Sequence, residues 1–537
     1  MFEDWKMPVP AEIRAVPRPR NTIVVDRGGD GPKRYAVRAR AGAKYGPHGK
    51  TLPINGQVIG HIIQGAFVPI TPEKKLASTG PQELSFGAAA FAHSVSLDLF
   101  RDLTEIYDVQ NACEILAIAL IRSIKPDVKN RRLATEYRRT YISRYLPGLH
   151  LSGNHVGKLL EGLGMDRSKR EAFFAHRIAD IEVDHHVLID GMLKQDTSTV
   201  NDFSAYSYKA HVKGCKDISI IYAYDIEKME PVCAEVFAGN RVDASAFATF
   251  VRDQKLTRGI IVADKGFPTS QIQDELIGHP DLHYLIPIKR TDSRIRNNDM
   301  LKFQGVLTAI DGQVHYCKKK LRTNRFLYAF KDHAKADGER YAFIEKMKTD
   351  PTVTEANFEA KSELFGVIVF ESDLDLSPLT AYLCYEDRWQ IELVFDAYKN
   401  DELLDRTNVQ GDFSVRGSEF INFLTTVLTC RMRHKAQRAG LLGKLSYRDL
   451  LEDLGTAWRK VEGPLPPKSD DEYWVADYKG AFTLMEALGL SDAGIRSKRP
   501  DDVTHEGVVI PRKPGRPRVR PEFVGPKRPR GRPRKLQ

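Results

Sequence analysis

The spacing of apolar residues changes along the chain and divides it into segments. Three short β-rich runs between residues 22 and 63, separated by Gly and Pro, predict strands. From residue 86 to about 178 the apolar residues recur at helical spacing, and several of these helices are basic. We therefore predict a β-rich N-terminal segment, residues 1–85, and a helical DNA-binding segment, residues 86–180.

A different pattern begins near residue 181. Apolar runs at 186–190, 218–224 and 232–237 predict three neighbouring strands, and a helix at 244–254 separates them from a fourth strand at 259–264. Three strands, a helix and a further strand indicate an α/β fold with a mixed sheet.

Aspartates end two of these predicted strands. Asp190 closes the first run and Asp264 closes the last. Both would lie at the carboxyl edges of their strands, where open α/β sheets tend to place their sites. An aspartate there is also an ordinary turn former, so neither residue defines a site by itself.

From residue 181 to the end of the chain, we predict five further segments. The mixed sheet occupies a first core segment (181–284) and a second core segment (371–440), with a β-rich insertion (285–370) between them. A helical C-terminal segment (441–505) and a basic tail (506–537) follow.

Four polar residues share one predicted helical stripe in the second core segment. Tyr385, Arg388, Glu392 and Lys399 fall within about 60° of one another at ~100° per residue. An Arg–Glu pair four residues apart is common on exposed helices, so the stripe has an ordinary explanation as well. A carboxylate between two cations and a phenol also suits a site that holds a divalent metal and binds phosphates.

Asp190, Asp264 and Glu392 therefore form a candidate set of catalytic metal ligands. Carboxylates without His or Cys partners favour Mg²⁺, with Mn²⁺ as a substitute, over zinc. Two such ions, ~4 Å apart, can activate an attacking oxygen and stabilise a leaving oxygen in phosphoryl transfer.

Length and charge narrow the class of protein. The 537 residues carry a formal net charge of +10. Eleven basic residues and one acid lie between 511 and 537, so the other 510 residues are formally neutral. No apolar run is long enough to span a bilayer, no signal-peptide pattern opens the chain, and the six cysteines form no C-x-x-C pair. We expect a cytoplasmic protein associated with the nucleoid.

The tail repeats the core Gly-Arg-Pro-Arg, with Arg516 and Arg518 in one copy and Arg532 and Arg534 in the other. Glycine permits close approach, proline keeps the backbone extended, and arginine can enter the narrow minor groove of A·T-rich DNA. These copies resemble AT-hooks. The alternative is a basic tail that adds unspecific, salt-sensitive affinity. In either case we expect the tail to be disordered without DNA.

The order of these motifs resembles the DDE transposases of bacterial insertion sequences, in the branch marked by a Y-(2)-R-(3)-E-(6)-K helix. Tyr385, Arg388, Glu392 and Lys399 match that spacing, and the segments around Asp190 and Asp264 resemble the two aspartate motifs. The similarity extends from about 21 to 423.

The resemblance implies an RNase H-like core in which Asp190, Asp264 and Glu392 bind two Mg²⁺ ions. Tyr385, Arg388 and Lys399 would hold phosphates of the transposon end. The implied reaction is hydrolysis at the ends of the element, followed by joining of the 3′ hydroxyls to target DNA. The implied active form is a homodimer on paired ends of double-stranded DNA.

Some alternatives stay open. Asp196 rivals Asp190 as the first ligand, and Asp396 is a weaker rival of Glu392. We interpret His185 and His186 as packed or hydrogen-bonded histidines, because residues four apart on a strand do not easily share an ion with Asp190. A non-catalytic protein that binds A·T-rich DNA, or a DDE nuclease that does not join ends, would also fit the sequence.

Overall fold

The computed structural model describes residues 9–461, with gaps at 30, 32, 46–50, 70–81, 199, 211, 242–243, 264–272, 388, 402–403, 405 and 408, and also residues 473–476, 479–490 and 496–498. The chain divides into two compact units, Met1–Gln82 and Glu83–Gln537. None of the described helices combines the length and the apolar character that a bilayer-spanning segment needs.

The first unit is a small antiparallel sheet. Its strands β1 (Thr22–Asp26), β2 (Tyr35–Tyr45), β3 (Thr51–Ile63) and β4 (Ala66–Pro69) pair in sequence order. Val16, Val24, Val37 and Ile62 form its small core, against which α1 (Ala11–Ala15) places Ile13. The predicted strands of the N-terminal segment are therefore confirmed.

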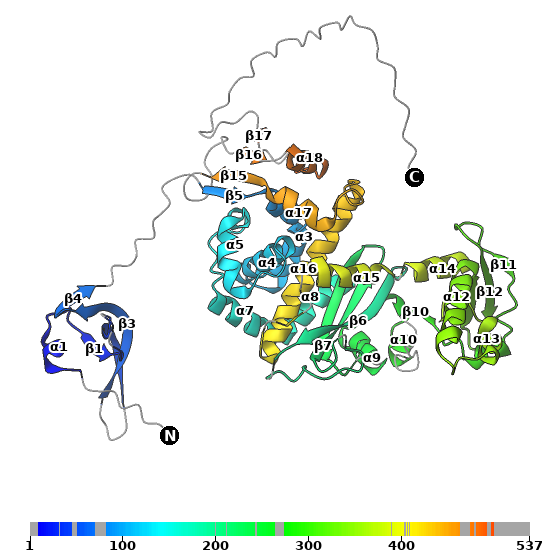
Figure 1. Cartoon of the computed structure of the whole chain (residues 1–537), viewed down its shortest axis with the longest axis horizontal. Coiled ribbons are helices and arrows are strands. Elements are labelled where there is room, and N and C mark those ends of the chain that lie inside the picture. Colours follow the sequence, from blue (N-terminus) through cyan, green and yellow to red (C-terminus); the bar gives the residue numbers. More distant parts are fainter. Residues whose placement is uncertain are drawn as a thin grey trace, which may run out of the picture. The chain divides into compact units, whose positions relative to one another are not determined.

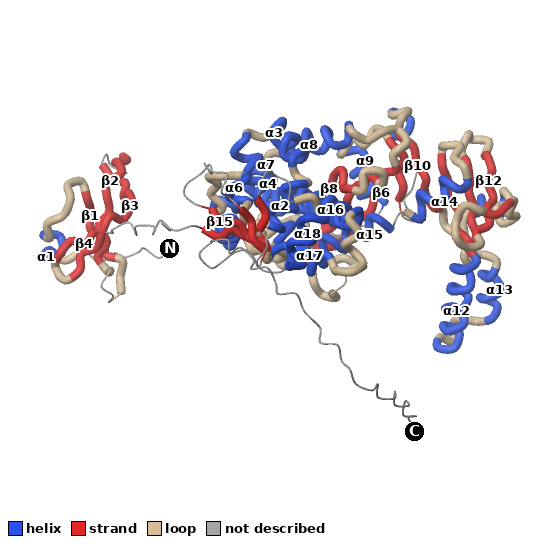
Figure 2. The backbone as a smooth tube through the Cα atoms, turned by 90° about the horizontal axis from the view of Figure 1, so that it is seen from above, coloured by secondary structure: helices blue, strands red, loops and turns tan. Residues whose placement is uncertain are grey.

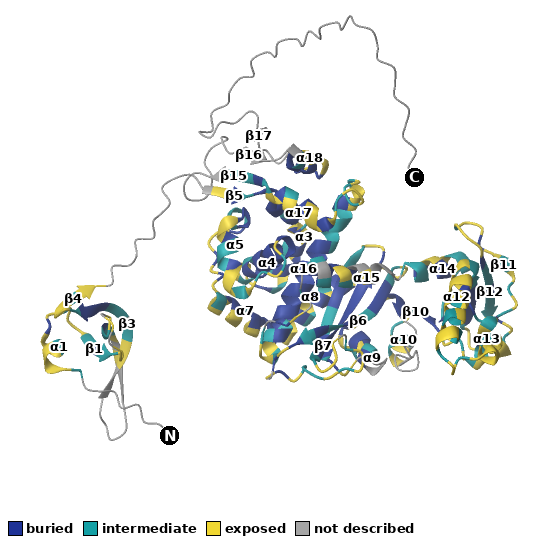
Figure 3. Ribbon diagram, in the orientation of Figure 1, coloured by how far each residue is buried: buried dark blue, intermediate teal, exposed yellow. Residues whose placement is uncertain are grey.

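Helices fill the first part of the second unit (Figure 1). They are α2 (Gly87–Ser94), α3 (Leu97–Ile106), α4 (Val109–Ile124), α5 (Leu133–Arg139), α6 (Ile142–Tyr145), α7 (Gly153–Met165) and α8 (Arg167–Ala179). Helix α4 is apolar along most of its length and largely buried (Figure 3). It packs against the 27-residue helix α16 (Asp412–Arg438), which joins the helical segment to the sheet.

Helices α7 and α16 touch through their backbones at two glycines. A Cβ on Gly417 would lie 1.9 Å from the carbonyl oxygen of Leu160, and one on Gly164 would lie 1.7 Å from that of Phe413. Any larger residue at either position would force the two helices apart.

A nine-stranded mixed sheet forms the centre of the second unit. Its first strands are β6 (His186–Asp196), β7 (Lys216–Asp225), β8 (Glu230–Ala238), β9 (Gly259–Ala263) and β10 (Leu282–Pro287), in the spatial order β8-β7-β6-β9-β10. Strands β6, β7 and β8 are antiparallel, whereas β9 runs parallel to both β6 and β10. Helices α9 (Ala244–Asp253) and α10 (Gln273–Gly278) make the connections on either side of β9. This order and these directions are those of an RNase H-like sheet, so the predicted fold class is confirmed.

The insertion extends the same sheet beyond β10. Strands β11 (Gly305–Val306), β12 (Val314–Lys320), β13 (Phe326–Asp332) and β14 (Val367–Ser372) continue it in the order β14-β13-β12-β11. The insertion also contains α11 (Ser293–Asn297), α12 (His333–Thr349) and α13 (Glu355–Ser362). Figure 2 shows α12 and α13 projecting from the strands as a pair.

The last part of the described chain consists of helices and three short strands. Helix α14 (Pro378–Glu386), helix α15 (Trp389–Asp396) and a π-helical turn η4 (Ala397–Asp401) precede α16, and α17 (Tyr447–Gly455) and α18 (Lys479–Ala487) follow it. Strands β15 (Ala457–Val461), β16 (Tyr473–Ala476) and β17 (Arg496–Lys498) also lie in the range predicted to be helical. They pair in one sheet with β5 (Gln82–Ser85), a partner so distant in sequence that local spacing does not reveal it.

Candidate active site on the central sheet

Asp190 lies in the middle of a strand, not at its end as the sequence predicted. Strand β6 continues to Asp196 because β7 pairs with it along its length, from Val187 opposite Asp225 to Asp196 opposite Lys216. Asp190 is half-buried, and its Oδ1 accepts a hydrogen bond from the Gly191 amide at 2.7 Å.

The parallel neighbour of β6 ends beside Asp190. Strand β9 stops at Ala263, which is the register partner of Ile189. These two residues directly precede Asp264 and Asp190 in the sequence. Asp264 itself lies outside the described residues. The described register nevertheless brings Asp190 to the carboxyl end of β9.

Helices α15 and α16 and the turn η4 cover the face of the sheet that carries Asp190. Asp190 is directly opposite Tyr222 on β7, and opposite residues of an antiparallel pair share a face. The Tyr222 ring contacts the rings of Phe395, Tyr398 and Phe423 at centroid distances of 6.1, 6.4 and 6.0 Å. These three aromatic residues come from α15, η4 and α16, so these elements pack on the face of Asp190.

Two polar contacts join β6 to the segment that contains Glu392, one before Asp190 and one after it along the strand. Four residues before Asp190, the Nε2 atom of His186 lies 2.9 Å from Sγ of Cys384. Four residues after Asp190, Nζ of Lys194 donates to the hydroxyl of Tyr398 at 2.7 Å. The segment from Cys384 to Tyr398 therefore runs along β6 in the same direction as the strand. Its middle part, α15 with the exposed Glu392, lies over the stretch that contains Asp190.

The predicted four-residue stripe does not lie on one continuous α-helix. Helix α14 ends at Glu386, α15 begins at Trp389, and Lys399 lies in the π-helical turn. The break follows from packing, because α14 contacts β12 and β13 of the insertion whereas α15 contacts β6. π-Helical turns are rare and occur frequently at functional sites.

Tyr385 and Lys399 belong to the predicted stripe together with Glu392, and both are described in the structure. Tyr385 is half-buried, and its ring packs against that of Phe370 at a centroid distance of 4.6 Å. Lys399 is also half-buried. Arg388 lies outside the described residues, as do the tail residues Arg516, Arg518, Arg532 and Arg534.

Asp196, the alternative to Asp190 as the first metal ligand, accepts hydrogen bonds from the loop that follows β6. Asp196 is only 3% exposed, its Oδ1 accepts from the Ser198 amide at 3.0 Å, and its Oδ2 accepts from the Asn201 side chain at 2.7 Å. Both carboxylate oxygens thus have local donors, which favours a structural role. Asp396, the rival of Glu392, is exposed at the last position of α15.

The histidines before Asp190 are hydrogen-bonded, in agreement with our interpretation. His185 Nδ1 lies 2.8 Å from Asp225 Oδ2, and His186 Nδ1 lies 2.7 Å from Glu227 Oε1. Burial would lower the pKa of His186, but its hydrogen bonds with Cys384 and Glu227 outweigh burial and raise that pKa to about 10.

Groups that could hold a cation also occur at the start of β6. Glu182, Asp184 and His185 form one such group, and His185, Asp225 and Glu227 form another. In the second group, Asp225 already accepts from His185 and from the Lys228 amide at 2.9 Å. These hydrogen bonds explain the second cluster without an ion.

A buried polar network next to the site was not foreseen from the sequence. Nζ of Lys194 lies 2.7 Å from Oε1 of Glu419, and the Tyr398 hydroxyl donates to Oε2 of the same carboxylate at 2.6 Å. Lys194 and Glu419 are almost fully buried. The available signal was a single lysine on the Asp190 face of an apolar strand, together with a glutamate inside an apolar helix.

The central region of the chain matches a known family. Residues 182–428 match the family described as Transposase DDE domain. This region of the chain is similar to that domain and is called the DDE domain after it. The matched range includes β6, β9, the insertion and α15, and thus all three predicted carboxylates of the DDE domain.

Comparisons over the whole chain are more distant. No curated protein sequence matches the chain. The piggyBac transposase synaptic complex with hairpin DNA is 13% identical, with 70% of this chain and 81% of that chain covered and a TM-score of 0.37. The Mos1 transposase paired-end complex with the left transposon end is 12% identical, with 33% and 58% covered and a TM-score of 0.13. Likeness at this level says nothing of how the DDE domain binds its ligands.

Proposed function

We propose that this protein is a DNA transposase that cuts phosphodiester bonds at the ends of a bacterial insertion sequence and joins the 3′ hydroxyls to target DNA. One observation carries the proposal: within a DDE domain, Asp190 lies at the end of β9 and beneath the helix that bears Glu392. This arrangement supports Asp190, Asp264 and Glu392 as a single carboxylate site.

The donor chemistry fits Mg²⁺, for which Mn²⁺ is a substitute. Glu392 is exposed and Asp190 is half-buried, so hard carboxylate oxygens are accessible on this face. Asp190, Asp264 and Glu392 would hold two ions, which when bound supply activation of the attacking oxygen and charge stabilisation at the leaving oxygen. Tyr385, Arg388 and Lys399 would orient the phosphates of the transposon end by hydrogen bonds and charge.

The proposed partner is double-stranded DNA, with a homodimer on paired transposon ends as the active form. The basic tail would add affinity for A·T-rich DNA through its AT-hook-like copies. We place the protein in the cytoplasm, in association with the nucleoid, because its proposed substrates are there.

The test is a strand-transfer assay with Mg²⁺ that compares the wild type with Glu392→Gln. The substrate is the DNA that flanks the gene, which should contain the ends of the element. We expect cleaved and joined products from the wild type only. A DNA-binding assay and a thermal melt of both proteins control for loss of binding or folding.

Other outcomes assign other functions. Cleavage without joining would indicate a nuclease, and tight binding with neither reaction would indicate a DNA-binding remnant. Equal activity of Glu392→Gln and the wild type would contradict the assignment of Glu392.

A further inference from the structure

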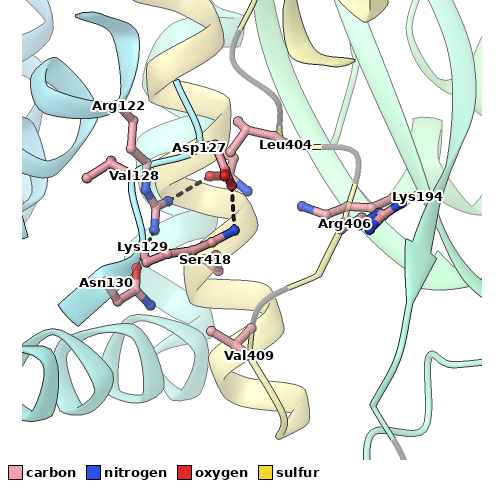
Figure 4. A pocket seen from close by; sticks show the side chains of 11 residues that line it. Arg122, Asp127, Val128, Lys129, Asn130, Lys194, Leu404, Arg406, Val409 and Ser418 are labelled. Atoms are coloured by element: carbon pink, nitrogen blue, oxygen red, sulfur yellow. Dashed lines mark hydrogen bonds and ion pairs between the residues drawn. The ribbon is translucent and has the colours of Figure 1, made fainter. Parts of the chain in front are cut away.

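Many cations of the second unit pair with neighbouring acids, but the basic hairpin of the insertion, formed by β12 and β13, carries more cations than its acids can pair. In the pocket of Figure 4, for example, Lys129 pairs with Asp127 at 2.5 Å, and Lys194 pairs with Glu419 at 2.7 Å. The basic hairpin instead has five cations between residues 318 and 325, and no acid occurs from residue 312 to residue 331. Such a concentration of charge indicates a surface for an anionic partner.

Two of these five cations are neutralised by acids that follow β13 in the sequence. Lys318 pairs with Asp375, and Arg325 pairs with Glu371 at 2.9 Å. The remaining three cations are Lys319, Lys320 and Arg322. Within the described part of the chain, no acid forms an ion pair with any of these three. The basic hairpin therefore keeps three positive charges after its ion pairs are counted.

The end of the basic hairpin holds these cations on a regular backbone and exposes two of them. Seven register pairs join β12 to β13 without interruption. The Leu321 amide closes the turn by donating to the Arg325 carbonyl at 2.7 Å. Lys320 and Arg322 are exposed, whereas Lys319 is half-buried. A large partner can therefore reach Lys320 and Arg322 while the backbone of the hairpin stays in place.

The aromatic residues next to Lys320 are buried. Nζ of Lys320 lies 5.5 Å from the centroid of the Phe326 ring. Phe326 is 5% exposed, and Tyr328 is fully buried. Because stacking on a nucleic-acid base needs an accessible ring, this end of the hairpin offers charge and not base stacking. Exposed charge of this kind suits a phosphate backbone, which cations bind without regard to sequence.

The basic hairpin belongs to the same sheet as the candidate active site, and Lys320 shares a face with Asp190. One row of register partners crosses six neighbouring strands of that sheet. From β6 to β12 its members are Leu188, Val262, Leu285, Ser372, Phe326 and Lys320. Register partners lie on one face, and so does Asp190, which is two residues after Leu188. At ~4.8 Å per strand, Lys320 lies about 24 Å from β6 across the sheet.

Tyr385, which we propose to hold a phosphate, packs on this face between Asp190 and Lys320. Its ring centroid lies 4.6 Å from that of Phe370 on β14. Phe370 is two residues before Ser372 and so lies on the same face as the row. Strand β14 separates β10 from β13 in the sheet. Asp190, Tyr385 and Lys320 therefore follow one another across a single face.

We propose that Lys320 and Arg322 contact the phosphate backbone of duplex DNA that is bound on the face of Asp190. Their side chains supply charge at the far end of that face, beyond Tyr385. The choice of duplex DNA as the partner rests on the proposed function, whereas the attraction of the basic hairpin for a phosphate backbone rests on its own charge.

The first test measures binding of a duplex of about 30 base pairs against salt concentration, for the full-length protein and for Lys320→Gln/Arg322→Gln. We expect the double variant to bind several-fold more weakly and to lose about one to two units of salt slope, because each phosphate contact releases about one counterion. Binding equal to that of the wild type would overturn the proposal whether or not the protein cleaves DNA.

The matched control is Lys346→Gln/Lys361→Gln, which removes two exposed cations from α12 and α13 of the same insertion. Nζ of Lys361 lies 5.4 Å from the centroid of the Phe343 ring, so this control also removes a cation that lies over an aromatic ring. Equal loss of binding in the control would indicate dependence on net charge alone and contradict a contact at the hairpin. Thermal melts check folding, and Arg322→Gln alone serves if the double variant is less stable.

The second test locates the contact on the DNA. Single methylphosphonates, which are neutral, replace each phosphate in turn along a transposon end. We expect at least one replacement to weaken binding by the wild type but not by Lys320→Gln/Arg322→Gln. If every replacement affects both proteins equally, the proposed contact is wrong. If the wild type shows the contact but does not cleave DNA with Mg²⁺, the proposed function fails and the contact stands.

A third measurement separates DNA from RNA as the partner of the basic hairpin. The salt titration is repeated with duplex RNA of the same length. Weaker binding of RNA by Lys320→Gln/Arg322→Gln, with unchanged binding of DNA, would assign the hairpin to RNA and overturn its assignment to DNA.

Discussion

Asp190 and Asp196 lie on the same strand and the same face, yet their carboxylates have different surroundings. Asp196 is buried and accepts hydrogen bonds from two groups of the loop that follows β6. Asp190 is half-buried, beside the end of β9 and under α15. The contrast separates a structural acid from a candidate catalytic acid, although both are aspartates in one short stretch.

Asp190→Asn should therefore abolish cleavage, by at least ~10³-fold, while DNA affinity and stability stay close to those of the wild type. Asp264→Asn should behave in the same way. Asp196→Asn should instead lower the free energy of unfolding by about 1–3 kcal/mol and retain cleavage at a temperature where it is folded. Single-turnover cleavage, DNA binding and thermal melts check these outcomes, and equal loss of binding and cleavage in Asp264→Asn would mean that Asp264 is structural.

His186 should make stability depend on pH. Its folded-state pKa of about 10 exceeds the ordinary value of 6.5, so the stabilisation is complete below pH 6.5 and disappears as the pH rises towards 10. The difference in unfolding free energy between wild type and His186→Gln should be on the order of 2 kcal/mol at pH 6 and close to zero near pH 10. Urea denaturation across this range measures it, and a difference independent of pH would argue against a charged His186.

At the scale of elements, the placement of α15 depends on contacts at both of its ends. The Cys384–His186 contact attaches α14 to the start of β6, and the Tyr398–Lys194 contact attaches η4 near the end of that strand. Glu419 of α16 binds both Lys194 and Tyr398. A shift of α16 would thus move η4, and with it the helix that bears Glu392.

Tyr398→Phe should cost about 1–2 kcal/mol of stability, and Glu419→Gln about 3–5 kcal/mol, because the second change removes the carboxylate that pairs with the buried Lys194. We expect both variants to slow single-turnover cleavage at least ~10-fold with saturating DNA, since they disturb the position of α15. Higher Mg²⁺ should partly restore the rate if Glu392 is misplaced. Wild-type rates in variants that are folded at the assay temperature would limit the network to a role in stability.

At the scale of the whole molecule, the basic charge lies at the two ends of the chain. Residues 1–82 carry 13 basic and 6 acidic side chains, and residues 511–537 carry 11 and 1. The remainder has more acidic than basic residues, 64 against 57. If the protein binds DNA as proposed, long-range attraction to DNA should therefore originate mainly at the two ends of the chain.

Deletion of residues 511–537 should flatten the salt dependence of DNA binding and weaken the preference for A·T-rich duplexes. Cleavage of short transposon ends should continue, because the candidate carboxylates are intact. Binding titrations on A·T-rich and G·C-rich duplexes at several salt concentrations make the comparison. An unchanged salt slope would refute a DNA-binding role for the tail.

Local patterns in the sequence predicted most of the elements and the chemistry of the candidate site. Apolar runs identified β7, β8 and β9, because strands buried on both faces are largely apolar. Two predicted strand ends and one helical stripe indicated Asp190, Asp264 and Glu392 as candidate ligands, because carboxylate oxygens are the ligands that Mg²⁺ prefers.

The tertiary structure decided what depends on distant partners. Pairing with β7 carries β6 past Asp190, pairing with β5 turns a portion of the predicted C-terminal helix into strands, and packing on two different surfaces separates α14 from α15. The buried network likewise needs Lys194 and Glu419, which are 225 positions apart in the sequence. Such contacts are stabilised by groups that only the folded chain brings together, so no local pattern specifies them.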